Sequence, residues 1–174
     1  MMTLVMAVVA LGVSTVAIGG LTALPASATA AADCSAPAAP NVDWSDCNKN
    51  GVDLHSANLS GANLSGANLT HTNLINANLT QANLKRAKLP RADLSLAELE
   101  IANLSGANLT DDAYLDNANL SDADLSDANL SYADLRTADL RSTDLSNADL
   151  TRAQCGDDTV WPDGSKDHGT TCPK

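Results

Sequence analysis

Residues 56–84 read SANLSGANLSGANLTHTNLINANLTQANL, and a leucine occupies every fifth position of this stretch. Ala, or Thr72 once, precedes each Leu by two residues, and Asn precedes it by one. A period of five suits neither a straight helix, at about 3.6 residues per turn, nor a flat strand, at about 2. It suits a chain that turns a corner once per unit and points Leu and Ala inward. The Gly, Ser, Thr and Asn residues between the leucines are typical of turns.

The same unit, Ala-Asn/Asp-Leu-x-x, runs from Val52 to about Cys155. We call the Leu position i, so that Ala is i−2, Asn or Asp is i−1, and the corner residues are i+1 and i+2. This pattern resembles the pentapeptide-repeat family, whose motif is A(D/N)Lxx. The resemblance implies an all-β fold, a right-handed quadrilateral parallel β-helix with four units per coil. Coils stacked at about 4.8 Å give about five coils and a rod about 24 Å tall, capped at both ends.

One irregularity interrupts the repeat. In ANLTDDAYLDN, residues 107–117, six steps rather than five separate Leu109 from Leu115. Ala113-Tyr114-Leu115 is an ordinary unit with Tyr in the usual Asn place, so the extra residue is predicted in the corner 110–112. A bulge there would let Leu115 stack over Leu94.

The first thirty residues are apolar and uncharged, and they end in Ala26-Ser27-Ala28 and Ala28-Thr29-Ala30. Small-x-small sites after an apolar segment are typical of exported proteins. We therefore predict a signal peptide over residues 1–30, cleaved near Ala28 or Ala30, and a secreted or cell-envelope location. The alternative is an uncleaved membrane anchor, because the apolar run approaches the roughly 20 residues that span a bilayer.

The cysteines agree with export. An even number in an exported chain predicts disulfides, and four cysteines allow three pairings. Proximity in sequence favours Cys34 with Cys47 and Cys155 with Cys172.

These features divide the chain into four parts: signal peptide 1–30, N-terminal cap with a disulfide 31–51, pentapeptide-repeat β-helix 52–155, and C-terminal disulfide-closed cap 156–174. Trp44 and Trp161 lie near the two ends of the repeat and are candidates to cover them.

Charge is uneven along the repeat. Residues 111–150 contain ten Asp against only Arg136 and Arg141. The predicted acidic face comprises Asp122, Asp124, Asp127 and Asp144. Its simplest role is to keep the protein soluble. Residues twenty apart should stack, with one added across the slip, so Arg136 is expected over Asp116 and Arg152 over Tyr132.

A basic run, KRAKLPR at 85–91, lies near apolar residues at corner positions. Apolar residues beside basic ones are a plausible contact surface, although single surface apolar residues are common. The candidate interaction patch comprises Ile75, Lys85, Arg86, Lys88, Arg91, Leu96 and Ile101.

The sequence offers no catalytic set. His55, His71 and His168 do not converge with a nucleophile and an acid in any stacked column. The cysteines lack the C-x-x-C spacing of zinc sites, and no Lys-Ser/Thr follows the glycines as in a phosphate loop. We therefore predict no enzyme activity, no catalytic residue, no metal and no cofactor.

The leading hypothesis is a secreted, non-enzymatic, monomeric structural or interaction module that presents rigid polar faces to an unknown protein or envelope component. The resemblance implies an alternative, because some family members are acidic mimics of DNA that bind gyrase. Those act in the cytoplasm, favour Phe at i and dimerise through a C-terminal helix. This chain has a predicted signal peptide, Leu at i and a cysteine-closed tail, so a DNA-mimic role is not expected, and nucleic acid is not expected as a partner. A third hypothesis is a membrane-tethered envelope protein.

Overall fold

The computed structural model describes residues 32–166 and 172. The chain divides into two units, Met1–Ala30 and Ala31–Lys174, and every described residue belongs to the second. The predicted signal peptide lies outside the described residues. Within them, no helix has the length and apolar character needed to cross a membrane.

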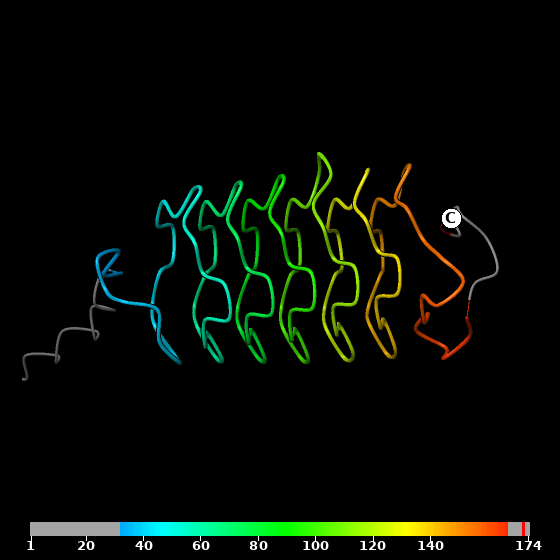
Figure 1. Ribbon diagram of the computed structural model, residues 1–174, viewed down its shortest axis with the longest axis horizontal. Coiled ribbons are helices and arrows are strands. Elements are labelled where there is room, and N and C mark those ends of the chain that lie inside the picture. The colour runs from blue at the N-terminus through cyan, green and yellow to red at the C-terminus, as the bar shows by residue number, and fades with distance from the viewer. Residues whose placement is uncertain (1–31, 167–171, 173–174) are drawn as a thin grey trace, which may run out of the picture. The chain divides into compact units, whose positions relative to one another are not determined.

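The backbone winds into a parallel β-helix whose coils stack on one another (Figure 1). Its β structure consists of single-residue parallel bridges between i−1 residues, such as Asn63 with Asn83. A spacing of twenty residues means four units per coil, as predicted. The parallel bridges begin at Asp43 and extend to Val160. The repeat predicts boundaries at residues 52 and 155. The β-helix therefore extends beyond the predicted boundary at each end.

Three backbone hydrogen bonds per regular unit hold adjacent coils together. The Leu64 amide donates to the Asn83 carbonyl at 2.7 Å, and the Asn83 amide donates back to the Ala62 carbonyl at 2.8 Å. At the corner, the Gly66 amide donates to the Lys85 carbonyl at 2.9 Å. Between units, the i+2 residue adopts a positive φ, for example 60° at Gln81 and 57° at Arg86. This left-handed residue makes the corner, which is why turn residues occupy it.

The interior is a continuous column of Leu and Ala. Every i leucine from Leu59 to Leu140 has an exposed fraction of 0%. Each such burial contributes about 1.5–3 kcal/mol. Thr72 and Thr143 replace Ala at i−2 because their hydroxyls donate to the carbonyls of Lys49, at 3.0 Å, and Leu120, at 2.7 Å.

Four columns of i−1 residues define four sides, which we number as faces in chain order. Face 1 carries Asp53, Asn73, Asp93, Tyr114, Asp134 and Gln154. Face 2 carries Asn58, Asn78, Glu98, Asn119, Asp139 and Val160. Face 3 carries Asp43, Asn63, Asn83, Asn103, Asp124 and Asp144. Face 4 carries Asn48, Asn68, Lys88, Asn108, Asn129 and Asp149. Faces 1 and 3 are opposite, as are faces 2 and 4.

The predicted slip is confirmed. Asp93 bridges to Tyr114, twenty-one residues on, and the spacing stays at twenty-one for the rest of that coil before it returns to twenty at Tyr114 with Asp134. Asp111 and Asp112 both have positive φ, 59° and 64°, so the corner holds one extra residue. This yellow-green corner projects beyond those of the preceding coils (Figure 1). We call residues 43–109 the lower coils and residues 113–161 the upper coils.

A second slip lies at the C-terminal end, where Asp139 bridges to Val160, also twenty-one residues on. Thr159-Val160-Trp161 is therefore a repeat unit, with buried Trp161 in the i position. The Thr159 hydroxyl donates to the Leu135 carbonyl at 3.0 Å, in the same way that the Thr72 hydroxyl donates to the Lys49 carbonyl. Trp161 is thus part of the column rather than only a cover over it.

The N-terminal end is built in the same way. Val42-Asp43-Trp44 and Cys47-Asn48-Lys49 are repeat units, with buried Trp44 and half-buried Lys49 at i. The Lys49 ammonium lies 3.5 Å from the centre of the Trp44 ring and donates to the Cys34 carbonyl at 2.9 Å. Burial lowers the pKa of Lys49, and the charge of Asp33 opposes this.

Both disulfides have the pairing that proximity favours. Cys34 is bonded to Cys47 with a Cα separation of 5.4 Å, and Cys155 to Cys172 with a separation of 5.2 Å.

Candidate functional surfaces

Leu and Ala fill most of the interior of the β-helix, and the buried hydroxyls of Thr72, Thr143 and Thr159 donate to backbone carbonyls, so the polar groups open to a partner lie on the four faces and their corners. Any recognition by the described residues is therefore a property of these outer surfaces.

The structure brings the four predicted acidic residues together. Asp124 and Asp144 are stacked neighbours on face 3, and Asp122 and Asp127 lie at the corners on either side of Asp124. The hydroxyl and amide of Ser146 lower the pKa of Asp144. These four residues, which we call the acidic face, form a negative surface on the upper coils.

The seven residues of the predicted interaction patch do not form one patch. Lys88 lies on face 4, with Lys85 and Arg86 at the corner before it and Arg91 at the corner after it. The apolar members lie around face 2: Ile75 and Leu96 precede it and Ile101 follows it. Each five-residue unit advances the chain by a quarter of a coil, so residues ten apart in sequence lie on opposite sides.

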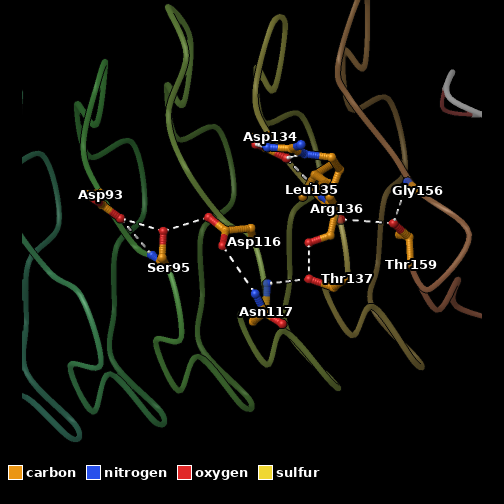
Figure 2. A network of polar contacts seen from close by, with 10 residues as sticks. All are labelled: Asp93, Ser95, Asp116, Asn117, Asp134, Leu135, Arg136, Thr137, Gly156 and Thr159. Carbon is orange, nitrogen blue, oxygen red and sulfur yellow. Dashed lines mark hydrogen bonds and ion pairs between the residues drawn. The ribbon is translucent and has the colours of Figure 1, made fainter.

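A chain of polar contacts runs across face 1 and the corner after it (Figure 2). The Ser95 hydroxyl lies 2.6 Å from both an Asp93 and an Asp116 oxygen. A hydroxyl has one proton, so the two carboxylates share it. The backbone amide of Asn117, next to Asp116, donates to the Thr137 hydroxyl of the next coil at 3.0 Å. These contacts connect successive coils from outside the core.

Arg136 pairs with Asp134 rather than with Asp116, the partner that stacking predicts. Its Nε and Nη2 donate to the two oxygens of Asp134 at 2.9 and 2.5 Å. Burial of Asp134 disfavours its charged form and so acts to raise its pKa. The hydrogen bonds and the charge of Arg136 outweigh this effect, and the pKa of Asp134 is lowered. The predicted contact of Arg152 with Tyr132 is confirmed at 2.6 Å.

Sequence reasoning missed the Asp134–Arg136 pair and the equivalent Asp139–Arg141 pair. The signal for both was Asp-Leu-Arg, because i−1 and i+1 project from the same strand and turn.

Within residues 32–166, no group of three or more His, Cys, Asp or Glu is positioned to hold a metal ion. His55 and His71 lie at different corners, and His168 lies outside the described residues.

Five-residue units, four inward columns and single-residue bridges define a parallel β-helix solenoid of the quadrilateral type. The family model of pentapeptide repeats, with eight copies, matches residues 31–66, 47–86, 77–111 and 112–154. The chain therefore belongs to the pentapeptide-repeat family.

Several solved structures are similar to this chain. A pentapeptide repeat protein from the cyanobacterium Cyanothece 51142 is 31% identical with a TM-score of 0.64, covering 66% of this chain and 90% of that one. HetL from Nostoc sp. PCC 7120, involved in heterocyst differentiation regulation, is 32% identical with a TM-score of 0.34, covering 73% and 71%. QnrB1, a plasmid-mediated fluoroquinolone resistance protein, is 20% identical with a TM-score of 0.41, covering 67% and 62%. No curated protein matches.

Proposed function

We propose that this protein is an exported, non-enzymatic interaction module whose acidic face binds a macromolecule with a basic surface, either a protein or an envelope component. In this proposal about five rigid coils, capped at both ends, hold the face in a fixed shape. The observation that carries the proposal is the gathering of Asp122, Asp124, Asp127 and Asp144 on and beside face 3. Pentapeptide repeat proteins are generally structural or interaction proteins, which agrees with it.

Export is supported by the apolar segment 1–30 and by the two disulfides, which are typical of oxidising compartments. Mass spectrometry of the mature protein tests it, and a new N-terminus near Ala28 or Ala30 is expected. Recovery of the intact segment in the membrane fraction would instead indicate a tethered envelope protein.

Binding is tested by comparing the wild-type protein with a variant in which the four acidic-face residues are changed to Asn. Asn keeps the side-chain oxygen that accepts a hydrogen bond from Ser126 or Ser146, so the fold should persist. We expect the wild type to retain a partner from culture supernatant or cell envelope at low salt and to release it at high salt. The variant should not retain this partner at either salt concentration. Equal capture by both proteins would refute the role of this face.

The same acidic face is also what a DNA mimic would use against gyrase. A supercoiling assay with the mature protein separates the two functions: inhibition would favour the mimic, and we expect none.

A further inference from the structure

One coil of the β-helix, residues 83–102, carries two opposite surfaces of different chemistry. Around face 4 lies the basic side, made of Lys85, Arg86, Lys88 and Arg91. Around face 2 lies the apolar-acidic side, made of Leu96, Glu98, Glu100 and Ile101. All eight residues are exposed, and the ladder places the two sides at the same level of the rod.

Two of these residues interrupt otherwise regular columns. On face 4, Lys88 is exposed between half-buried Asn68 and Asn108. On face 2, Glu98 is exposed in the same way between half-buried Asn78 and Asn119. Both side chains therefore reach further from the rod than their stacked neighbours.

The apolar members of the coil are costly where they lie. Leu96 and Ile101 have φ of 61° and 59°, a conformation that bulky and β-branched residues disfavour. They are also 54% and 52% exposed, so the core gains little from them. Equivalent corners elsewhere carry residues suited to such turns, for example Asn76 and Gly61. Folding alone does not account for these two side chains.

The charges of this coil are not used within the fold. Across residues 32–166, the side chains of Lys85, Arg86, Lys88 and Arg91 form no hydrogen bond or ion pair with another residue, and neither do those of Glu98 and Glu100. By contrast, Arg136 and Arg141 of the upper coils are each bound to a carboxylate of their own coil. The charges of coil 83–102 are therefore free to meet a partner.

We propose that copies of this protein associate side by side, with the apolar-acidic side of one copy against the basic side of the next. The glutamates meet the cations, and Leu96 and Ile101 pack on the aliphatic stems of the Lys and Arg side chains. The two surfaces differ and lie on opposite faces, so the contact is heterologous and produces open rows rather than a closed dimer. Asp124 and Asp144 of the acidic face, on face 3, stay uncovered along such a row.

Sedimentation velocity of the disulfide-intact mature protein tests this proposal. At low ionic strength the wild type should form species larger than dimers as its concentration rises, and high salt should disperse them. The variants Lys88→Glu/Arg91→Glu and Glu98→Lys/Glu100→Lys should each be monomeric, because like charges then meet. An equal mixture of the two should associate again, since each altered side complements the other.

Asp53→Lys, a charge reversal on face 1 that lies outside both sides and outside the acidic face, is the matched control and should associate like the wild type. Circular dichroism verifies that every variant is folded. A monomeric wild type at low ionic strength, a closed dimer, or no recovery in the mixture would each overturn the proposal.

A second variant separates association from folding. Leu96→Asn/Ile101→Asn places a turn residue at both corners, so its thermal midpoint should rise or stay unchanged. Its association should nevertheless be about tenfold weaker, because apolar contact area is lost. Unchanged association would contradict the part assigned to the two apolar side chains.

Discussion

The lower and upper coils share one interior and differ in how their i−1 side chains are satisfied. In the lower coils, Asn donates to the residue one coil below, as Asn83 does to Asn63 at 3.2 Å and Asn73 to Asp53 at 3.0 Å. In the upper coils, Asp accepts from its own turn, as Asp124 does from Ser126 at 2.6 Å. Asn both donates and accepts, whereas ionised Asp only accepts. The difference shows that exchanging Asn for Asp changes the outer hydrogen bonds and leaves the core columns intact.

The largest effect should come from the shared interior. Leu99 and Leu120 are fully buried, and the Leu99 amide bonds to the carbonyl of Asn119, one coil above. Changing either to Ala should cost about 2–5 kcal/mol of unfolding free energy. The two losses should agree within about 1 kcal/mol, because both sites have the same surroundings. Denaturant unfolding measures both free energies. A much smaller loss for Leu120→Ala than for Leu99→Ala would show that the core of the upper coils is packed more loosely.

The ion pairs of the upper coils should make the stability of the protein depend on pH. Asp134 has a folded-state pKa below its ordinary value of 3.8, so its pairing stabilises the fold above that pH and is lost as the pH falls below it. Arg136→Gln should therefore lower the thermal midpoint at pH 7, and the difference from wild type should vanish in strong acid.

Arg141→Gln is the matched control, because the Asp139 side chain is 26% exposed against 6% for Asp134. Arg141→Gln should therefore lower the thermal midpoint by less than Arg136→Gln does. A difference between Arg136→Gln and wild type that persists at low pH would mean that the arginine acts through packing alone.

The Asn ladder of the lower coils can be broken at one position. Asn83→Asp removes the amide that donates to Asn63 and should cost about 0.5–1.5 kcal/mol in denaturant unfolding. Asn103→Asp is the comparison, since among the described contacts the Asn103 side chain only accepts, from Ser105. Asn103→Asp should therefore lower the free energy of unfolding by clearly less than Asn83→Asp. Equal losses would show that the hydrogen bond from Asn83 to Asn63 does not stabilise the fold.

The smallest effect should come from the slip between the two regions. Deleting Asp112 should be tolerated or slightly stabilising, by up to about 0.5 kcal/mol, because it removes one of two consecutive positive-φ residues. Thermal unfolding checks this, and a large loss of stability would show that the bulge supports the stacking.

The sequence predicted most of the fold because Leu and Ala at i and i−2 leave few alternatives. The slip at residues 110–112 was predictable because the same unit resumes after it. The outermost units were not recognised, because Trp44 and Trp161 take the place of Leu at i. Val42 and Thr159 in place of Ala were the remaining clues.

The surfaces were predicted less well, for physical reasons. The five-residue period placed Asp124 and Asp144 in one column, as the bridges do, and the role of the acidic face in binding stays a prediction. The patch of basic and apolar residues was wrong as one surface, because residues near in sequence were taken as near in space. Arg136 does lie one coil above Asp116, whose charge acts on it, but its hydrogen bonds go to Asp134 because contacts within a turn can win over contacts between coils.

Native-state hydrogen exchange tests most directly whether one continuous core underlies two different exteriors. The Leu99 amide bonds to Asn119 and the Leu120 amide bonds to Asp139, so one lies on each side of the slip. We predict that both exchange only through global unfolding, with free energies that agree within about 1 kcal/mol. Separate, easier opening of the upper coils with its boundary at residues 110–112 would contradict the account.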